Sequence, residues 1–120
     1  MRTRLENGQV AFLTGVEVEQ VCLGKYQIIL NCSSDVSISV ESSLRHLVAD
    51  ETASAEWNAD GATGLPHIHR LLGSVISGIS VQQDGSLLLR FSQGDTVLVG
   101  IRSDGLESFQ ITKPNVCVVV

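Results

Sequence analysis

The chain has 120 residues, of which 43% are hydrophobic and 18% are charged, and its formal net charge is −5. A chain of this length suits one domain, and this composition argues against disorder over most of its length. The negative charge argues against nucleic acid and anionic membranes as partners, because both require a basic surface, and it leaves a basic protein as the permitted partner.

The first half of the chain contains three segments that are typical of strands, separated by turn residues. They are residues 16–23, 26–32 and 36–40. In the last of them apolar and polar residues alternate, which places Val36, Ile38 and Val40 on one buried face. We therefore predict a three-stranded antiparallel meander within residues 15–42.

The middle of the chain, residues 50–73, lacks a sustained period. Residues 50–64 predict an acidic loop, and Pro66 and Gly73 are placed as the start and end of one short helix. Between His46 and His69 there are four acidic residues and no Lys or Arg, so this segment carries −4 of the net −5. The acidic residues are Asp50, Glu51, Glu56 and Asp60.

The second half, residues 74–120, repeats the pattern of the first at an offset of about 60 residues. The Asp84-Gly85 and Gly94-Asp95 pairs predict tight turns between three strands, and residues 107–112 and 116–120 predict two more strands. The expected fold is a single, mostly β domain over residues 1–120 with one short helix. In it, two three-stranded antiparallel meanders pack as a roll, barrel or sandwich.

The sequence does not predict a metal site or an active site. His67 and His69 diverge on a helix, so we expect neither a metal nor another cofactor. Glu17 and Glu19 share one strand face, where they are expected to be solvated rather than to act as an acid–base pair. Three cysteines in β-type surroundings are expected to be buried free thiols, although a bridge across the hairpin from 22 to 32 remains open in an oxidising compartment. They are Cys22, Cys32 and Cys117.

Trp57, the single tryptophan, lies in the predicted acidic loop. It either fixes this loop to the core or anchors a protein interface, since large aromatic residues ringed by polar groups are common interface anchors. Both interpretations remain open at the level of sequence.

Several segments resemble a family of small, β-rich bacterial proteins that has no assigned activity. In the second half the similarity begins at Gly73 and includes Val81–Ser92, Gly94, Val97–Val99 and Glu107–Ile111. Phe109 stands in a position that is more often Trp in the family. In the first half the similar segment is Tyr26–Leu30. The resemblance implies a compact β domain with an intervening short helix and no catalytic residues to carry over. Some small acidic proteins of this general kind are immunity partners of bacterial toxins.

We therefore expect a cytoplasmic, non-enzymatic immunity protein that neutralises a basic toxin through an acidic surface. The expected binding residues are Asp50, Glu51, Glu56, Trp57 and Asp60. One alternative is a small-molecule-binding or enzymatic β-barrel whose interior pocket uses Tyr26, His46 or the strand acids. Another is a homo-oligomer that pairs along the strand at 116–120.

Overall fold

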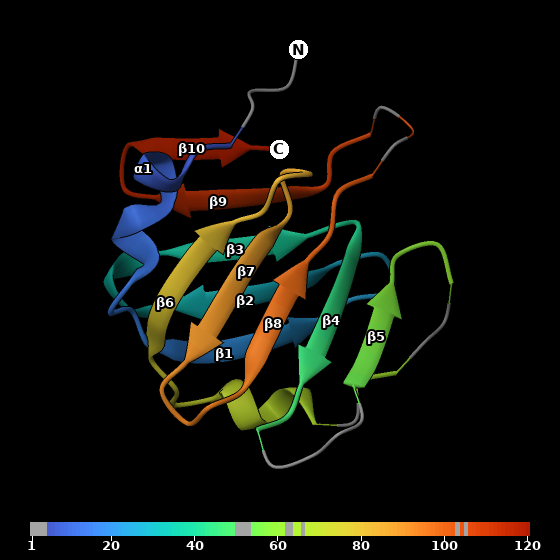
Figure 1. Ribbon diagram of the computed structural model, residues 1–120, viewed down its shortest axis with the longest axis horizontal. Helices are drawn as coiled ribbons and strands as arrows, with labels where there is room; N and C mark the ends of the chain where they lie inside the picture. The colour runs from blue at the N-terminus through green and yellow to red at the C-terminus, as the bar shows by residue number, and fades with distance from the viewer. Residues whose placement is uncertain (1–4, 50–53, 62–63, 66, 103, 105) are drawn as a thin grey trace.

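The computed structural model describes residues 5–49, 54–61, 64–65, 67–102, 104 and 106–120, and these form two five-stranded antiparallel sheets (Figure 1). Sheet one has the order β1-β2-β3-β9-β10, and sheet two has the order β5-β4-β8-β7-β6. The strands of sheet one are β1 (Val18–Leu23), β2 (Ile28–Cys32), β3 (Ser37–Val40), β9 (Phe109–Lys113) and β10 (Val116–Val119). Those of sheet two are β4 (Ser43–Leu47), β5 (Ser54–Asn58), β6 (Ile76–Val81), β7 (Leu87–Phe91) and β8 (Thr96–Val99).

Each half of the chain contributes strands to both sheets. β1, β2 and β3 lie side by side in sheet one, but β4 and β5, which follow them in the chain, pair onto β8 in sheet two. The second half does the reverse, because β9 and β10 pair onto β3 in sheet one. The predicted grouping of the strands into two three-stranded meanders is therefore not confirmed, because each sheet has five strands and includes a hairpin from the other half.

The apolar faces of the two sheets share one core. Val36, Ile38 and Val40 are all buried, as their alternation with serine predicts, and they belong to the same cluster as Leu89 and Val97 of sheet two. Figure 1 shows the strands of sheet two crossing in front of those of sheet one. Neither sheet closes on itself, so the arrangement is not the barrel that the sequence left open.

Backbone hydrogen bonds join the two sheets at one corner. The Gly15 amide donates to the Ile76 carbonyl at 2.8 Å, and the Val18 amide donates to the Ser74 carbonyl at 2.9 Å. This corner connects the start of β1 to the start of β6. β5 and β10 therefore remain as the outer strands at the other edges of the two sheets.

The helical elements are short. The N-terminal segment forms α1 (Asn7–Val10) and the 3-10 helix η1 (Ala11–Leu13), which the sequence analysis missed, and η2 (Ser33–Asp35) occupies a predicted turn. The helix expected over residues 66–73 is the four-residue 3-10 helix η3 (Ile68–Leu71), and Gly73 beyond it has a φ of +79°. None of the helices in the described ranges is long and apolar enough to cross a membrane.

β5 corrects part of the predicted acidic loop. Glu56 and Trp57 lie on this edge strand, which pairs with β4 along its whole length, rather than in an irregular segment. β4 was not predicted either. Trp57 is the only large apolar residue of β5, so the strand depends on pairing with β4 more than on its own pattern.

A buried carboxylate at the start of β8 connects three elements of the fold. Both Asp95 and His46 have no exposed surface, and Nε2 of His46 donates to Oδ2 of Asp95 at 2.8 Å. Arg70 of η3 binds both carboxylate oxygens at 3.0 Å, and the Ala49 amide donates to Oδ1 at 2.9 Å. Burial alone would raise the pKa of Asp95, but these hydrogen bonds outweigh it and lower the pKa to about 2.

Replacing Asp95 is expected to destabilise the fold. Asp95→Asn removes the buried negative charge that pairs with Arg70, at a cost of about 3 kcal/mol in the free energy of unfolding, which urea denaturation measures. Because the folded pKa of Asp95 lies below its unfolded value of about 4, its stabilising contribution is present above pH 4 and is lost as the pH falls toward 2. The exposed-acid control Glu19→Gln should change stability by less than about 0.5 kcal/mol. Equal stability of both variants would contradict this role of Asp95.

Candidate functional site

A pocket opens at one side of the molecule, where several connections converge. It has a volume of about 610 Å³ and mainly apolar walls. The pocket lies on the side of β5 in Figure 1. The segments that meet there are the β1–β2 turn, the β3–β4 corner, the residues after β5 and the β8–β9 connection. We call it the Tyr26 pocket, and its lining residues are Gly24–Gln27, Glu41, Ala59, Asp60, Arg102, Leu106 and Glu107.

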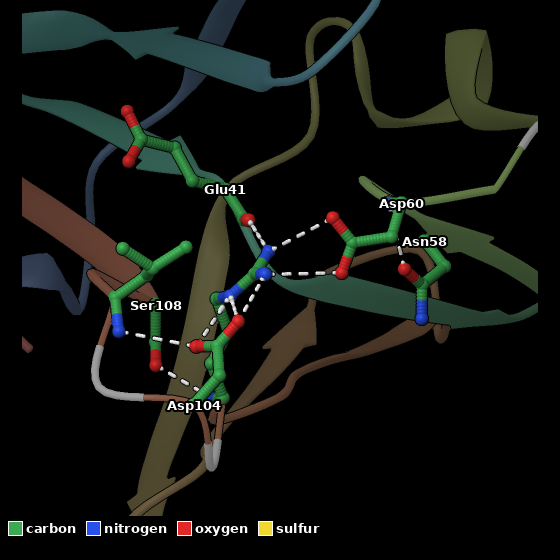
Figure 2. Close-up of polar contacts among 7 residues, drawn as sticks. Glu41, Asn58, Asp60, Asp104 and Ser108 are labelled. Carbon is green, nitrogen blue, oxygen red and sulfur yellow. Dashed lines mark hydrogen bonds and ion pairs between the residues drawn. The ribbon is translucent and has the colours of Figure 1, made fainter.

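Arg102 forms the fixed wall of the pocket. Its side chain is 14% exposed, and its guanidinium ion-pairs with Asp60 at 3.0 Å and also binds Asp104, whose Oδ1 lies 3.1 Å from Nε. Nη1 also donates to the backbone carbonyl of Glu41 at 3.1 Å. Figure 2 shows Asp60 and Asp104 approaching from two sides. Arg102 therefore ties the β3–β4 corner and the end of β5 to the β8–β9 connection.

This ion-pair cluster is held in its charged form. The hydrogen bond from Arg102 keeps the pKa of Asp104 well below its usual range, and a second hydrogen bond from the Leu106 amide acts in the same direction. The hydrogen bonds that Arg102 donates to Asp104 also raise the pKa of Arg102. Arg102 and Asp104 are therefore both charged at neutral pH, and the Arg102 guanidinium is paired with the carboxylates of Asp60 and Asp104.

Two large apolar side chains stand exposed beside this wall. Tyr26 is 65% exposed and Leu106 is 59% exposed, and both line the pocket. Nζ of Lys25 lies 5.2 Å from the centre of the Tyr26 ring, within the range of a cation–π interaction. The pocket thus combines apolar surface with an aromatic ring that already has a cation close to it.

Two further carboxylates line the pocket. Within the described part of the chain, neither Glu41 nor Glu107 makes a side-chain hydrogen bond or ion pair. Figure 2 shows the Glu41 carboxylate directed away from the Arg102 cluster, although its backbone carbonyl belongs to it. Glu41 and Glu107 therefore add two carboxylates to the pocket beyond the pair that binds Arg102.

Of the five predicted binding residues, Glu56, Trp57 and Asp60 lie in the described part of the chain. Asp50 and Glu51 lie outside the described residues. Glu56 is exposed on β5 and pairs with Arg45 at 3.3 Å. Asp60, whose side chain is 70% exposed, is the one described acid of this set that lines the Tyr26 pocket.

Trp57 packs inward. It is only 8% exposed and belongs to the core cluster, so it fixes β5 to the core, as one of the two interpretations of the sequence expected. Its edge still contributes to a hollow of about 280 Å³ that adjoins the Tyr26 pocket through Tyr26 and Asp60. Trp57 therefore belongs both to the core cluster and to the lining of this hollow.

The residues considered for chemistry lie elsewhere. His46 is fully buried and bound to Asp95, while Glu17 and Glu19 are exposed on β1 and the segment before it, as expected. Burial raises the pKa of the Cys32 thiol to about 11, with a smaller contribution from Glu19. No group of three or more potential metal ligands occurs among the residues that the structure describes.

Sequence analysis missed most of the pocket. Tyr26 was considered only for an interior site, and Glu41, Arg102, Leu106 and Glu107 were not considered at all. Two local signals point to them in hindsight. Tyr26 directly follows the Gly24-Lys25 turn, where a large aromatic residue has no strand face to occupy, and Arg102 precedes Asp104 at a spacing that permits a local ion pair.

Residues 10–120 match a family of unknown function (DUF6188), and the chain therefore belongs to this family. This agrees with the expectation of an uncharacterised family. No curated protein and no solved structure matches the chain.

The three cysteines are free, and the structure predicts that they differ in reactivity. Cys117 is exposed, contrary to expectation, Cys22 is half-buried and Cys32 is buried. At pH 8 only about one in a thousand Cys32 side chains is a thiolate, given its pKa of about 11. Iodoacetamide followed by peptide mass spectrometry should therefore label Cys117 first and leave Cys32 unmodified until the protein is unfolded. Early labelling of Cys32 in the folded protein would contradict its burial.

Proposed function

We propose that this protein is a non-enzymatic binding module that docks a basic protein partner on the Tyr26 pocket and the acidic residues around it. The observation that carries the proposal is the pocket itself, where the exposed Tyr26 and Leu106 stand beside the unpaired carboxylates of Glu41 and Glu107. Exposed aromatic and apolar residues ringed by charge are typical of interface hot spots.

The charges and the apolar groups have different roles in such an interface. The net charge of −5 and the carboxylates at the pocket accelerate encounter with a positively charged surface. Burial of Tyr26 and Leu106 then slows dissociation, because their apolar surface leaves water. Arg102 and its two carboxylates keep the rim in one shape, so little ordering is needed on binding.

The more specific form of the proposal is a cytoplasmic immunity protein that neutralises a basic bacterial toxin. A small acidic chain suits this role, because covering a basic active-site cleft requires a complementary surface and no catalysis. The resemblance of several segments to small bacterial proteins supports the same proposal. Glu56 on β5 adds an exposed carboxylate four residues before Asp60 of the pocket.

A paired capture experiment tests the proposal. Tagged protein and its double variant Asp60→Asn/Glu107→Gln are compared as baits in extracts of the source cell at low and moderate salt. We expect one stoichiometric basic protein, recovered best at low salt, whose affinity for the purified double variant is about fivefold weaker. Calorimetry measures that affinity, and co-expression shows whether the bait relieves toxicity of the captured protein.

The matched control is Glu17→Gln, which removes an exposed acid at the far end of sheet one. It should bind as the unmodified protein does. A partner that binds both variants with unchanged affinity would exclude the pocket as its docking site, and the absence of any stoichiometric basic partner would reject the proposal as a whole.

Self-association is a second candidate, favoured by the edge strand β10. Val120 and Phe109 exchange backbone hydrogen bonds of 2.9 and 3.3 Å, so by alternation the backbone groups of Cys117 and Val119 face away from β9. β10 contains no charged residue, whereas β5, an edge strand of sheet two, contains Glu56. Uncharged edges of this kind are suited to pairing with another strand.

Light scattering under reducing conditions distinguishes this candidate. If β10 pairs with a second copy, the unmodified protein has twice the mass of one chain, and Cys117→Lys returns it to a monomer because it places a charge at the edge. The matched control Cys117→Ser removes the same thiol without a charge and should remain dimeric. A monomer at all concentrations would eliminate the candidate.

By contrast, the alternative of an interior ligand pocket has no support in the described core. Leu30, Ile38 and Leu89 fill the space between the sheets without exposed surface, and His46 binds Asp95 there. Tyr26 lies at the surface instead.

A further inference from the structure

We infer that the Tyr26 pocket binds a single arginine side chain of the partner, an assignment that rests on the proposed binding function. Three features of the pocket favour this ligand: an exposed aromatic ring, two unpaired carboxylates and an apolar wall. An arginine presents a matching guanidinium at the end of an apolar stem.

The charges of the pocket favour a cation from outside. Of the two cations in its lining, Arg102 is already paired with Asp60 and Asp104, and Lys25 lies over the Tyr26 ring. Within the described residues, Glu41 and Glu107 have no internal partner, and the Glu41 carboxylate is directed away from the cluster (Figure 2). A cation that enters the pocket can therefore bind these carboxylates without breaking an existing ion pair.

The aromatic ring supplies a second interaction. Nζ of Lys25 lies 5.2 Å from the centre of the Tyr26 ring, which shows that this ring is accessible to a cation from within the chain itself. Tyr26 is 65% exposed, so a partner cation can stack on its free surface or displace Lys25. Leu106, which is 59% exposed, offers apolar surface to the stem of the side chain.

Arginine fits this combination better than lysine. A guanidinium is planar and weakly hydrated, so it stacks on an aromatic ring and binds a carboxylate through two parallel hydrogen bonds. An ammonium group retains its water more strongly and has no plane to stack. The volume of about 610 Å³ accommodates the side chain together with part of the partner backbone that carries it.

Nuclear magnetic resonance of the full-length, ¹⁵N-labelled protein tests the assignment. The probe is acetyl-Gly-Arg-Gly-amide, compared with the same peptide containing lysine or the neutral isostere citrulline. We expect saturable shifts confined to the amides of residues 24–27, 41 and 106–107, binding of arginine at least about threefold tighter than lysine, and no saturation with citrulline.

Two variants and one control complete the experiment. Tyr26→Ala and Glu41→Gln should each raise the dissociation constant of the arginine peptide at least about fivefold, whereas Glu17→Gln should leave it unchanged. Tyr26 is 65% exposed, and a retained amide spectrum confirms the fold of each variant. Equal binding of arginine and citrulline, equal binding of arginine and lysine, or insensitivity to Glu41→Gln would overturn the assignment.

The two proposals fail separately. If a captured basic partner is weakened by Asp60→Asn/Glu107→Gln but unaffected by Tyr26→Ala and Glu41→Gln, the binding function stands and the arginine assignment is wrong. If the arginine peptide binds as expected but no basic partner is captured, the pocket retains its selectivity and the proposed function is wrong.

Discussion

Neither half of this chain can complete its own sheet, and the rest of the structure depends on how this is resolved. Three neighbouring strands expose an apolar face and two unpaired edges, which is rarely stable in water. Each half sends its next two strands to the opposite sheet, so that β4 pairs with β8 and β9 pairs with β3. The shared core then contains residues from both halves, and neither half has a complete core without the other.

This exchange also creates the candidate site. The connections that leave one sheet for the other, at Glu41 between β3 and β4 and at Arg102 between β8 and β9, must cross at the same side of the molecule. Arg102 binds the carbonyl of Glu41 and the carboxylate of Asp60, and so holds the two crossings together. The pocket is therefore a consequence of the topology. The backbone connections set its shape, and the side chains line it.

The two charged clusters of the fold differ in their relation to solvent. Asp95 is fully buried and binds His46 and Arg70, so it connects β4 and β8 to η3 inside the protein. The Arg102 cluster lies at the surface, with the Asp60 side chain 70% exposed. We interpret the first cluster as part of the fold and the second as part of the binding surface.

The sequence by itself determined the mostly β class, the alternation that buries Val36, Ile38 and Val40, and the turns at Gly85 and Gly94, where φ is +92° and +103°. These features are local, because they depend on a two-residue period and on glycine at positive φ. The tertiary structure alone decided that β4 and β5 join the other sheet, that Trp57 is buried and Cys117 exposed, and that Tyr26 lines one pocket with Glu41 and Arg102. Contacts between residues so far apart in the chain leave no periodic signal in the sequence, since they arise from the pairing of whole strands.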